Sequence, residues 1–386
     1  MTDARVNLLD LTRPELEAWC VERGGKAFRA RQLFQWIYKR AETDFDAMTD
    51  LAKDFRAGLK QVAEIRLPEI ITRQDAADGT VKWMLKAGDA TKGNQGIASQ
   101  GIEMVYIPEV GRATLCISSQ VGCAMDCSFC STAQQGFNSN LSTAEIVGQV
   151  LLAQKELGFK AGDDRIISNV VLMGMGEPLA NFRSVVPALR ILLDELGLDF
   201  SRRRLTLSTS GLVPQIYKLA EESNVALAVS LHAPDDELRS ELVPINRRHN
   251  IAELLEACWA YIDEANGRSV TFEYVMLEGV NDSPAQARAL ARLLRGHPAK
   301  VNLIPFNPFP GTQYRRSRPE VIRAFLDQVL KGGVMATIRK TRGDDIDAAC
   351  GQLAGRVINR TTSRLGSKRV AVSVVAQPAT QPGAPS

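Results

Sequence analysis

The C-terminal two-thirds of the chain alternates between two patterns of apolar residues. Short runs rich in β-branched residues are separated by stretches in which apolar residues recur at helical spacing. The short runs predict strands at 113–118, 166–173, 204–208, 226–231, 270–276 and 301–306. The longer stretches predict helices near 142–157, 183–196, 212–222, 251–265, 284–295 and 319–331. This alternation predicts an α/β fold with a parallel sheet, either doubly wound or closing toward a barrel, in which ligands bind beyond the carboxyl ends of the strands.

The N-terminal part of the chain has a different pattern. Thr12 and Glu15 have the spacing of a capping box, and the helical pattern that they begin breaks at Gly24 and Gly25. Two further stretches of helical spacing follow before residue 65, so a small helical module is predicted.

Strand-like runs follow this module. Residues 70–72 and 81–85 flank the turn-prone pair Asp78-Gly79, and 102–107 predicts one more strand. Residues 88–100 are rich in Gly, Asn, Gln and Ser and predict an exposed loop. We therefore expect five parts. They are a helical accessory domain (1–65), a β-rich connection (66–108), an α/β core (109–345), a C-terminal segment that carries Cys350 (346–375) and a disordered tail (376–386).

Composition narrows the class of protein. The 386 residues are 45% apolar and 24% charged, which is ordinary for two or three globular domains and excludes disorder, collagen-like repeats and a disulfide-dense scaffold. There is no apolar run of membrane-spanning length and no signal-peptide pattern, so we expect a reducing, cytoplasmic compartment and no membrane partner.

The net charge of +3 is small, but the basic residues are clustered. There are five clusters: Arg202 to Arg204; Arg247 and Arg248; Arg315, Arg316 and Arg318; Arg339, Lys340 and Arg342; and five basic residues after 351. Such patches can hold phosphates, although solvated surface charge explains them equally well on this observation alone.

Three of the seven cysteines form a C-x3-C-x2-C pattern directly after the first predicted core strand. They are Cys123, Cys127 and Cys130. A reducing compartment disfavours disulfides, and structural zinc requires a fourth ligand, whereas none of the three histidines lies nearby. Three thiolates suit a [4Fe-4S] cluster that leaves one iron open for a substrate or cofactor.

Polar residues and glycines follow several of the predicted core strands. Gly174, Gly176 and Glu177 follow the second strand, where glycines permit close backbone approach and a carboxylate can bind an ammonium group. Ser208, Ser230, Leu231, His232 and Asn307 lie at or after later strand ends. Each alone is explained by an ordinary loop, but together they surround one predicted barrel mouth.

The cysteine pattern, with Phe129 before its last cysteine, resembles the signature of the radical S-adenosylmethionine superfamily. Almost the whole chain resembles the RlmN family of dual-specificity RNA adenine-C2 methyltransferases. The matching stretches are 101–109, 116–136, 172–179, 206–211, 229–234, 302–310 and 342–351. The resemblance implies a partial (βα)6 TIM-like barrel with an N-terminal helical module and a short β extension.

The resemblance also implies roles for individual residues. It assigns Cys123, Cys127 and Cys130 to the cluster, and it assigns S-adenosylmethionine to Gly176, Glu177, Ser208, Ser230, Leu231, His232 and Asn307. It further makes Cys350 the methyl-carrying cysteine, Cys116 its partner and Glu103 the proton acceptor. The loop at 88–100 and the tail look longer than the family norm.

In the implied reaction, two molecules of S-adenosylmethionine are used per turnover. One methylates Cys350, and the other yields a 5'-deoxyadenosyl radical that removes a hydrogen atom from the new S-methyl group. The methylene radical adds to C2 of adenine, an electron-poor carbon that cannot attack an electrophilic methyl. Loss of an electron and of the C2 proton follows, and Cys116 then attacks the thioether sulfur, which leaves a disulfide with Cys350.

The implied partners are 23S rRNA near the peptidyl-transferase centre, certain tRNAs at the adenosine 3' of the anticodon, and an electron donor such as flavodoxin. We expect a monomer. There are three alternatives: a Cfr-type enzyme that methylates C8, a non-catalytic iron-sulfur RNA-binding protein and a radical activase of a partner protein.

Cys20 and Cys258 lie in helical patterns beside tryptophans and are predicted to be core residues.

Overall fold

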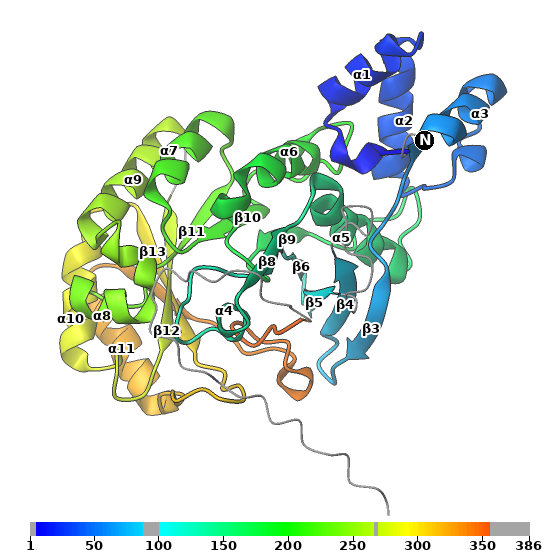
Figure 1. The fold of residues 1–386 in the computed structure, drawn as a ribbon. Coiled ribbons are helices and arrows are strands. Elements are labelled where there is room, and N and C mark those ends of the chain that lie inside the picture. Colours follow the sequence, from blue (N-terminus) through cyan, green and yellow to red (C-terminus); the bar gives the residue numbers. More distant parts are fainter. Residues whose placement is uncertain (1–4, 88–99, 266–268, 356–386) are drawn as a thin grey trace, which may run out of the picture.

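The computed structural model describes residues 5–87, 100–265 and 269–355. A ten-stranded mixed sheet runs through the molecule in the order β14-β13-β12-β11-β10-β9-β6-β5-β4-β3. Its parallel strands are β6 (Arg112–Cys116), β9 (Asn169–Leu172), β10 (Leu205–Thr209), β11 (Ala226–Ser230), β12 (Val270–Met276), β13 (Ala299–Pro305) and β14 (Met335–Ile338). Helices cover the outer side of this curved sheet, as in a partial barrel (Figure 1).

The helices of the barrel alternate with its strands. They are α5 (Thr143–Glu156), α6 (Phe182–Leu193), α7 (Val213–Glu222), α8 (Asp236–Leu242), α9 (Ile251–Glu264), α10 (Pro284–Leu294) and α11 (Pro319–Lys331). The six strands and six helices predicted from the sequence are confirmed to within a few residues. The strand β14 and the helix α8 were not predicted, because each is short and β14 exposes two of its four residues.

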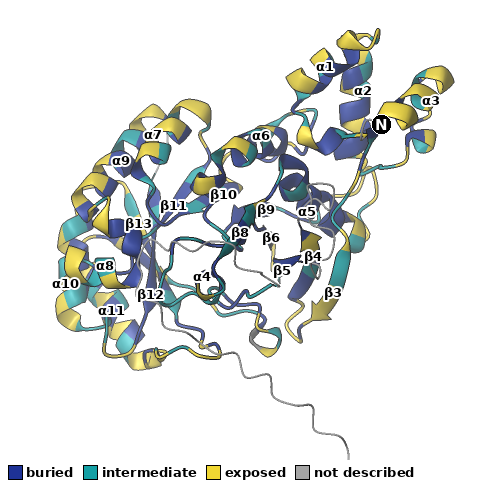
Figure 2. Cartoon of the chain, viewed as in Figure 1, coloured by how far each residue is buried: buried dark blue, intermediate teal, exposed yellow. Residues whose placement is uncertain are grey.

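Burial follows the pattern that predicted these elements. The central strands β9 to β12 and the sheet-facing sides of the helices are largely buried, whereas the edge strand β3 and the outer helix faces are exposed (Figure 2). Cys20 and Cys258 are both buried, as predicted for core residues.

Three helices form the N-terminal module, which stands at one end of the molecule (Figure 1). They are α1 (Arg13–Glu22), α2 (Ala27–Lys39) and α3 (Lys53–Val62). The predicted capping box of Thr12 and Glu15 is present. A side chain at Gly25 would place its Cβ 2.8 Å from the carbonyl oxygen of Cys20, so the chain can turn away from α1 only with glycine there.

The sheet is extended at one side by three antiparallel strands. They are β3 (Ile70–Asp75), β4 (Val81–Ala87) and β5 (Gln100–Glu109), and β5 pairs with β6. The predicted turn at Asp78-Gly79 joins the first two, with Gly79 at φ +82°. This extension carries Lys82 and Glu103 on neighbouring strands, beside the first strand of the barrel.

Two irregular segments meet at the carboxyl ends of the parallel strands. One runs from β7 (Gln120–Gly122) through α4 (Ser131–Gln134) to β8 (Phe137–Asn140) and carries the three clustered cysteines. The other follows β14 and carries Cys350. Residues 88–99 of the predicted loop, 356–375 of the C-terminal segment and the tail at 376–386 lie outside the described residues. Within the described residues, no helix is long and apolar enough to cross a membrane.

Candidate active site

The three clustered cysteines line one cavity. Cys123, Cys127 and Cys130 lie in the loop between β7 and α4, around a cavity of about 170 Å³. The backbone fixes this loop, because Cys123 N–H donates to Gly136 O (2.8 Å) and Cys130 N–H donates to Cys127 O (3.2 Å). The spacing in the sequence thus brings three cysteines to the wall of one cavity.

The donor set fits an iron-sulfur cluster. Burial raises the pKa of each of the three thiols, so they need bound metal to be held as thiolates. Among the described residues, no three His, Cys, Asp or Glu side chains converge as ligands of a single ion would. Three sulfurs distributed around a cavity suit a multi-iron cluster, in which each thiolate binds its own iron.

The rest of this cavity is made by strand ends. Gly176, Glu177, Ser208, Ser230 and His232 all line it, as the sequence predicted for one barrel mouth. Leu231 is buried beside them, and Asn307 lines a second cavity instead.

The Gly-x-Gly turn after β9 has a steric cause. Gly176 has φ +100°, and a Cβ there would lie 2.5 Å from Gln120 Cβ, so no other residue fits without displacing the cysteine-bearing segment. The neighbouring Glu177 carboxylate accepts hydrogen bonds from Ser210 N–H and Ser210 Oγ–H, both at 2.7 Å. Burial raises the pKa of Glu177, and these hydrogen bonds oppose that shift by stabilising the ionised form.

His232 is a neutral imidazole. Burial, aided by the charge of Arg239, lowers its pKa to about 3. Its Nδ1 accepts a hydrogen bond from Val275 N–H (3.0 Å), which leaves the proton on Nε2. Its ring also packs edge-on against Phe129, with centroids 4.5 Å apart. His232 can therefore donate one hydrogen bond into the cavity but carries no charge.

Arg239 is a residue that the sequence analysis missed. It lies on α8, is 0% exposed, and donates to the carbonyl oxygens of Ser210 (2.8 Å) and Ser230 (2.9 Å) at neighbouring strand ends. Burial lowers its pKa to about 10, so it remains charged at neutral pH. No sequence signal marked it, because α8 reads as a polar surface helix.

A larger cavity of about 530 Å³ adjoins the first. Cys116, at the end of β6, lines the larger cavity, and Cys350, Cys130, Glu273 and Arg339 line both. Cys350 therefore lies where the two cavities meet. The basic residues of the larger cavity are Arg112, Arg339, Lys340 and Arg342.

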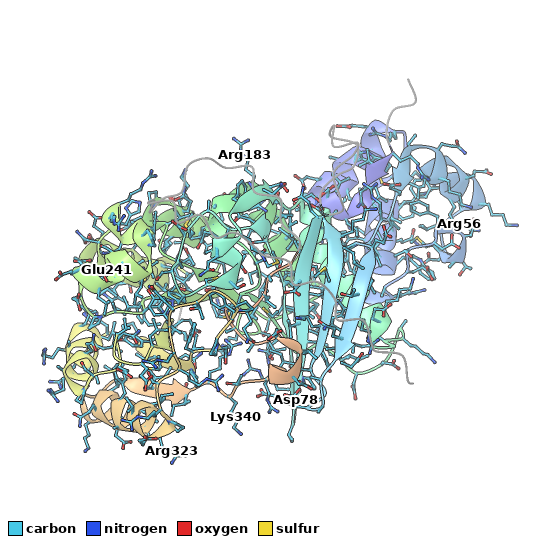
Figure 3. All side chains as sticks on the ribbon, turned by 60° about the horizontal axis from the view of Figure 1, so that its bottom comes forward. Arg56, Asp78, Arg183, Glu241, Arg323 and Lys340 are labelled. Atoms are coloured by element: carbon cyan, nitrogen blue, oxygen red, sulfur yellow. The ribbon has the colours of Figure 1, made fainter. Side chains whose placement is uncertain are left out.

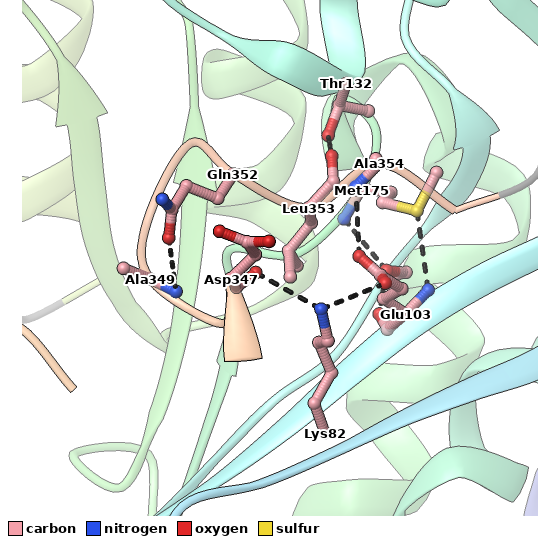
Figure 4. Close-up of polar contacts among 10 residues, drawn as sticks. Lys82, Glu103, Thr132, Met175, Asp347, Ala349, Gln352, Leu353 and Ala354 are labelled. Carbon is pink, nitrogen blue, oxygen red and sulfur yellow. Dashed lines mark hydrogen bonds and ion pairs between the residues drawn. The ribbon is translucent and has the colours of Figure 1, made fainter. Parts of the chain in front are cut away.

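The backbone around Cys350 is held on the side of the cysteine loop. Ser131 N–H donates to Gly351 O (2.9 Å). Thr132 Oγ–H donates to Leu353 O (2.6 Å), a contact drawn in Figure 4. Asn307 Nδ2 donates to Cys350 O (3.2 Å). Asn307 therefore contacts the C-terminal segment.

The electrostatics of Cys350 and Cys116 are coupled. Burial raises the pKa of the Cys116 thiol to about 12, and Cys350 adds to the shift. Burial also raises the pKa of Cys350. The charge of Arg339 lowers the pKa of both thiols, and Cys350 is the largest cause of the raised pKa of Arg339 itself. Arg339 is thus the cation common to the two cysteines, although the sequence showed it only as part of a basic cluster.

Glu103 lies away from the cavity walls. It lines neither cavity, and its Oε2 accepts a hydrogen bond from Ala354 N–H at 2.9 Å. Its Oε1 lies 3.4 Å from Lys82 Nζ (Figure 4). In this arrangement Glu103 contacts the segment that carries Cys350 and not the open space beside it.

Comparisons with known proteins agree with this geometry. Residues 6–65 match the ribosomal RNA large subunit methyltransferase N-terminal domain, and residues 117–291 match the radical SAM superfamily. A radical SAM methyltransferase from Sphaerobacter thermophilus is 45% identical, with a TM-score of 0.81 over 90% of this chain and 99% of that one.

Two more distant structures also align. A domain of a pyruvate-formate lyase-activating enzyme from Bacteroides vulgatus is 18% identical, with a TM-score of 0.34 over 45% of this chain and 99% of that one. SuiB from Streptococcus suis bound to S-adenosylmethionine is 14% identical, with a TM-score of 0.43 over 62% of this chain and 57% of that one.

Family membership rests on the Sphaerobacter methyltransferase and on the two matched segments together. The partial barrel, the three-cysteine cavity and the N-terminal helices are the parts that these matches cover. The chain belongs to the RlmN family of radical S-adenosylmethionine RNA methyltransferases, whose members use a [4Fe-4S] cluster and S-adenosylmethionine.

Proposed function

We propose that the protein methylates C2 of an adenosine in 23S rRNA near the peptidyl-transferase centre and of the adenosine 3' of the anticodon in some tRNAs. The observation that carries this is the position of Cys350, which lines both the cavity of the three clustered cysteines and the cavity of Cys116. A group attached to the Cys350 sulfur can be loaded from one cavity and delivered in the other.

Cys123, Cys127 and Cys130 hold the cluster, and Gly176, Glu177, Ser208, Ser230, Leu231 and His232 contribute to the S-adenosylmethionine site. When bound, the cluster and S-adenosylmethionine would supply a methyl group for Cys350. From a second S-adenosylmethionine they would supply a 5'-deoxyadenosyl radical that removes a hydrogen atom from that methyl group. Asn307 is also assigned to S-adenosylmethionine by the resemblance. Its side chain in addition donates a hydrogen bond to Cys350 O and so holds the Cys350 backbone.

Cys350 is the methyl carrier. Its thiol loses a proton and its sulfur accepts the methyl, a step that the charge of Arg339 favours by stabilising the thiolate. The methylene formed on this sulfur adds to C2, so that the base becomes joined to the protein through a thioether. The adduct radical must then lose one electron, which the oxidised cluster would accept when it is bound at Cys123, Cys127 and Cys130.

Glu103 accepts the proton from C2. Its carboxylate is held in place by two contacts, since Lys82 Nζ lies 3.4 Å from Oε1 and Ala354 N–H donates to Oε2 at 2.9 Å. This step requires Glu103 to exchange its contact with Ala354 for one with the substrate.

Cys116 releases the product. Its thiolate attacks the Cys350 sulfur, the S–S bond forms, the S–CH2 bond breaks, and the electron pair goes to the carbon, which takes up a proton to become the methyl group. The two cysteines end as a disulfide, which the electron donor, such as flavodoxin or a thiol reductant, must reduce before another cycle.

The larger cavity is the site for the base. A volume of about 530 Å³ lies within the range of small-molecule sites, and a base must leave its stack to enter it. Lys340 points outward at an edge of the molecule (Figure 3). Together with Arg342 and Arg112 it provides positive charge for phosphates around the flipped nucleotide.

The test is product analysis after anaerobic reconstitution with S-adenosylmethionine, a reductant and either rRNA or tRNA. Nuclease digestion and mass spectrometry should yield 2-methyladenosine, whereas 8-methyladenosine would identify a Cfr-type enzyme. RNA binding without S-adenosylmethionine cleavage would indicate a non-catalytic protein, and cleavage with unmodified RNA would favour an activase. Cys258→Ala, which lies outside both cavities, is the matched cysteine control and should remain active.

A further inference from the structure

A buried ion pair lies behind the segment that carries Cys350. Lys82 on β4 is 7% exposed and Glu103 on β5 is 5% exposed. Lys82 Nζ lies 3.4 Å from Glu103 Oε1. Both residues lie on regular antiparallel strands, so the sheet fixes their position.

Each member of this pair also binds one end of the same loop. Lys82 Nζ donates to Asp347 O (3.3 Å), three residues before Cys350. Glu103 Oε2 accepts from Ala354 N–H (2.9 Å), four residues after Cys350. Figure 4 shows both contacts converging on the pair. Hydrogen bonds to charged groups are the strong ones, so these two contacts are effective anchors.

The loop also contacts the barrel, where Asn307 Nδ2 donates to Cys350 O (3.2 Å) and Gln352 Nε2 donates to Pro308 O (3.0 Å). Ser131 and Thr132 hold Gly351 and Leu353 to the cysteine-bearing segment. The loop is therefore suspended between the barrel and the antiparallel strands. Without the anchors on the side of β4 and β5, the loop would keep its contacts with the barrel and the cysteine-bearing segment but lose those with the antiparallel strands, so Cys350 would be held less firmly.

We propose that Lys82 is a positioning residue for Cys350, which it holds at the junction of the two cavities through Asp347 O directly and through Glu103 and Ala354 N–H indirectly. Its importance for turnover rests on the proposed function, whereas its effect on the loop does not. Lys82 acts through the backbone and never needs to touch substrate or cofactor.

The direct test is the reactivity of Cys350 in the full chain prepared without the cluster, so that Cys350 is a free thiol. Iodoacetamide labelling of the Cys350 peptide, followed by mass spectrometry, should be about tenfold faster in Lys82→Met, because losing a bond to a charged group shifts a local opening equilibrium by roughly that factor. Hydrogen exchange at Ala354 should accelerate in parallel. Lys82→Arg should restore much of the protection.

Lys86→Met is the matched control. Lys86 lies on the same strand but is exposed, with its Nζ 3.2 Å from Glu69 Oε2. Cys350 should label in it at the wild-type rate. Because Lys82→Met leaves Glu103 buried without its cation, the double variant Lys82→Met/Glu103→Gln is the second test. It removes both charges, keeps an acceptor for Ala354 N–H, and should still label faster because the Asp347 anchor is gone.

Wild-type labelling of Cys350 in the double variant would overturn the proposal, because the Asp347 anchor is absent there. In the reconstituted enzyme, Lys82→Met should produce more 5'-deoxyadenosine per methylated RNA than the wild type, since the radical forms while its target is misplaced. A merely structural defect would lower the yields of 5'-deoxyadenosine and of methylated RNA together. If wild-type enzyme methylates no RNA, the proposed function fails while the labelling result still decides the role of Lys82.

Discussion

Product release by Cys116 should accelerate as the pH rises. Burial raises the pKa of Cys116 to about 12, and the attacking species is the thiolate. At pH 8 only roughly one thiol in ten thousand is ionised at such a pKa, and the ionised fraction grows about tenfold per pH unit. The rate of thioether cleavage should grow by the same factor as long as the pH stays below the pKa.

Formation of the covalent intermediate should lower the pKa of Cys116. Cys350 contributes to the raised pKa of Cys116, and a thioether at Cys350 carries no charge. The pKa of Cys116 in the intermediate should therefore lie below that of the free protein, but burial remains its largest cause. Arg339→Met removes the cation that lowers this pKa and should slow release at every pH without changing the slope. Arg323→Met, on the exposed face of α11, should have no effect.

The assay is a single-turnover pH jump. The conjugate of protein and RNA is formed at pH 6.5, transferred to buffers at intervals up to pH 8.5, and quenched into denaturant, and its disappearance is followed on a denaturing gel. A logarithmic slope near +1 is expected. A release rate that is independent of pH, or that falls as pH rises, would refute the assignment of Cys116 as a buried thiol that must ionise.

Three further predictions concern other parts of the chain. Replacing any one of Cys123, Cys127 or Cys130 by Ala should abolish the [4Fe-4S] absorbance and all turnover, because three ligands leave no redundancy; an intact cluster signal with retained activity would contradict the ligand assignment. Neutralising Lys340 and Arg342 together should make the plot of log affinity for RNA against log salt less steep, by roughly 0.7–0.9 per lost phosphate contact. An unchanged slope would show that both residues are ordinary surface charges that do not contact RNA. Arg239→Met should lower the free energy of unfolding by at least about 3 kcal/mol, since several buried carbonyl oxygens lose their donor, whereas the exposed Arg248→Met should leave the urea midpoint unchanged.

The sequence predicted those parts of the site whose chemistry depends on local spacing. The C-x3-C-x2-C pattern places three sulfurs in one loop, and that loop lines one cavity. Gly176 was predicted as a point of close backbone approach, and the structure gives the cause, since a Cβ there would meet Gln120. The alternation of strands and helices fixed which residues lie at strand ends and therefore at one edge of the sheet.

The residues that could not be predicted are long charged side chains whose surroundings are made by other elements of the fold. Arg239 lies on a short helix that reads as surface, and it is buried only because the ends of β10 and β11 lie against it. Lys82 interrupts an apolar strand and reads as solvent-facing, yet the C-terminal segment covers it. The burial of Lys82 depends on a residue 265 positions away, and that of Arg239 on two neighbouring strand ends, and periodicity encodes neither.

The central claim, that two cysteines divide the reaction, is tested most directly by Cys116→Ala. This variant should still methylate Cys350, cleave S-adenosylmethionine and attack the adenine, and should then stall as a protein–RNA conjugate through the Cys350 sulfur that survives denaturation and disappears on nuclease digestion. Cys350→Ala and the double substitution should give neither conjugate nor product. Normal turnover by Cys116→Ala, or an inactive Cys116→Ala free of RNA, would contradict the two-cysteine mechanism.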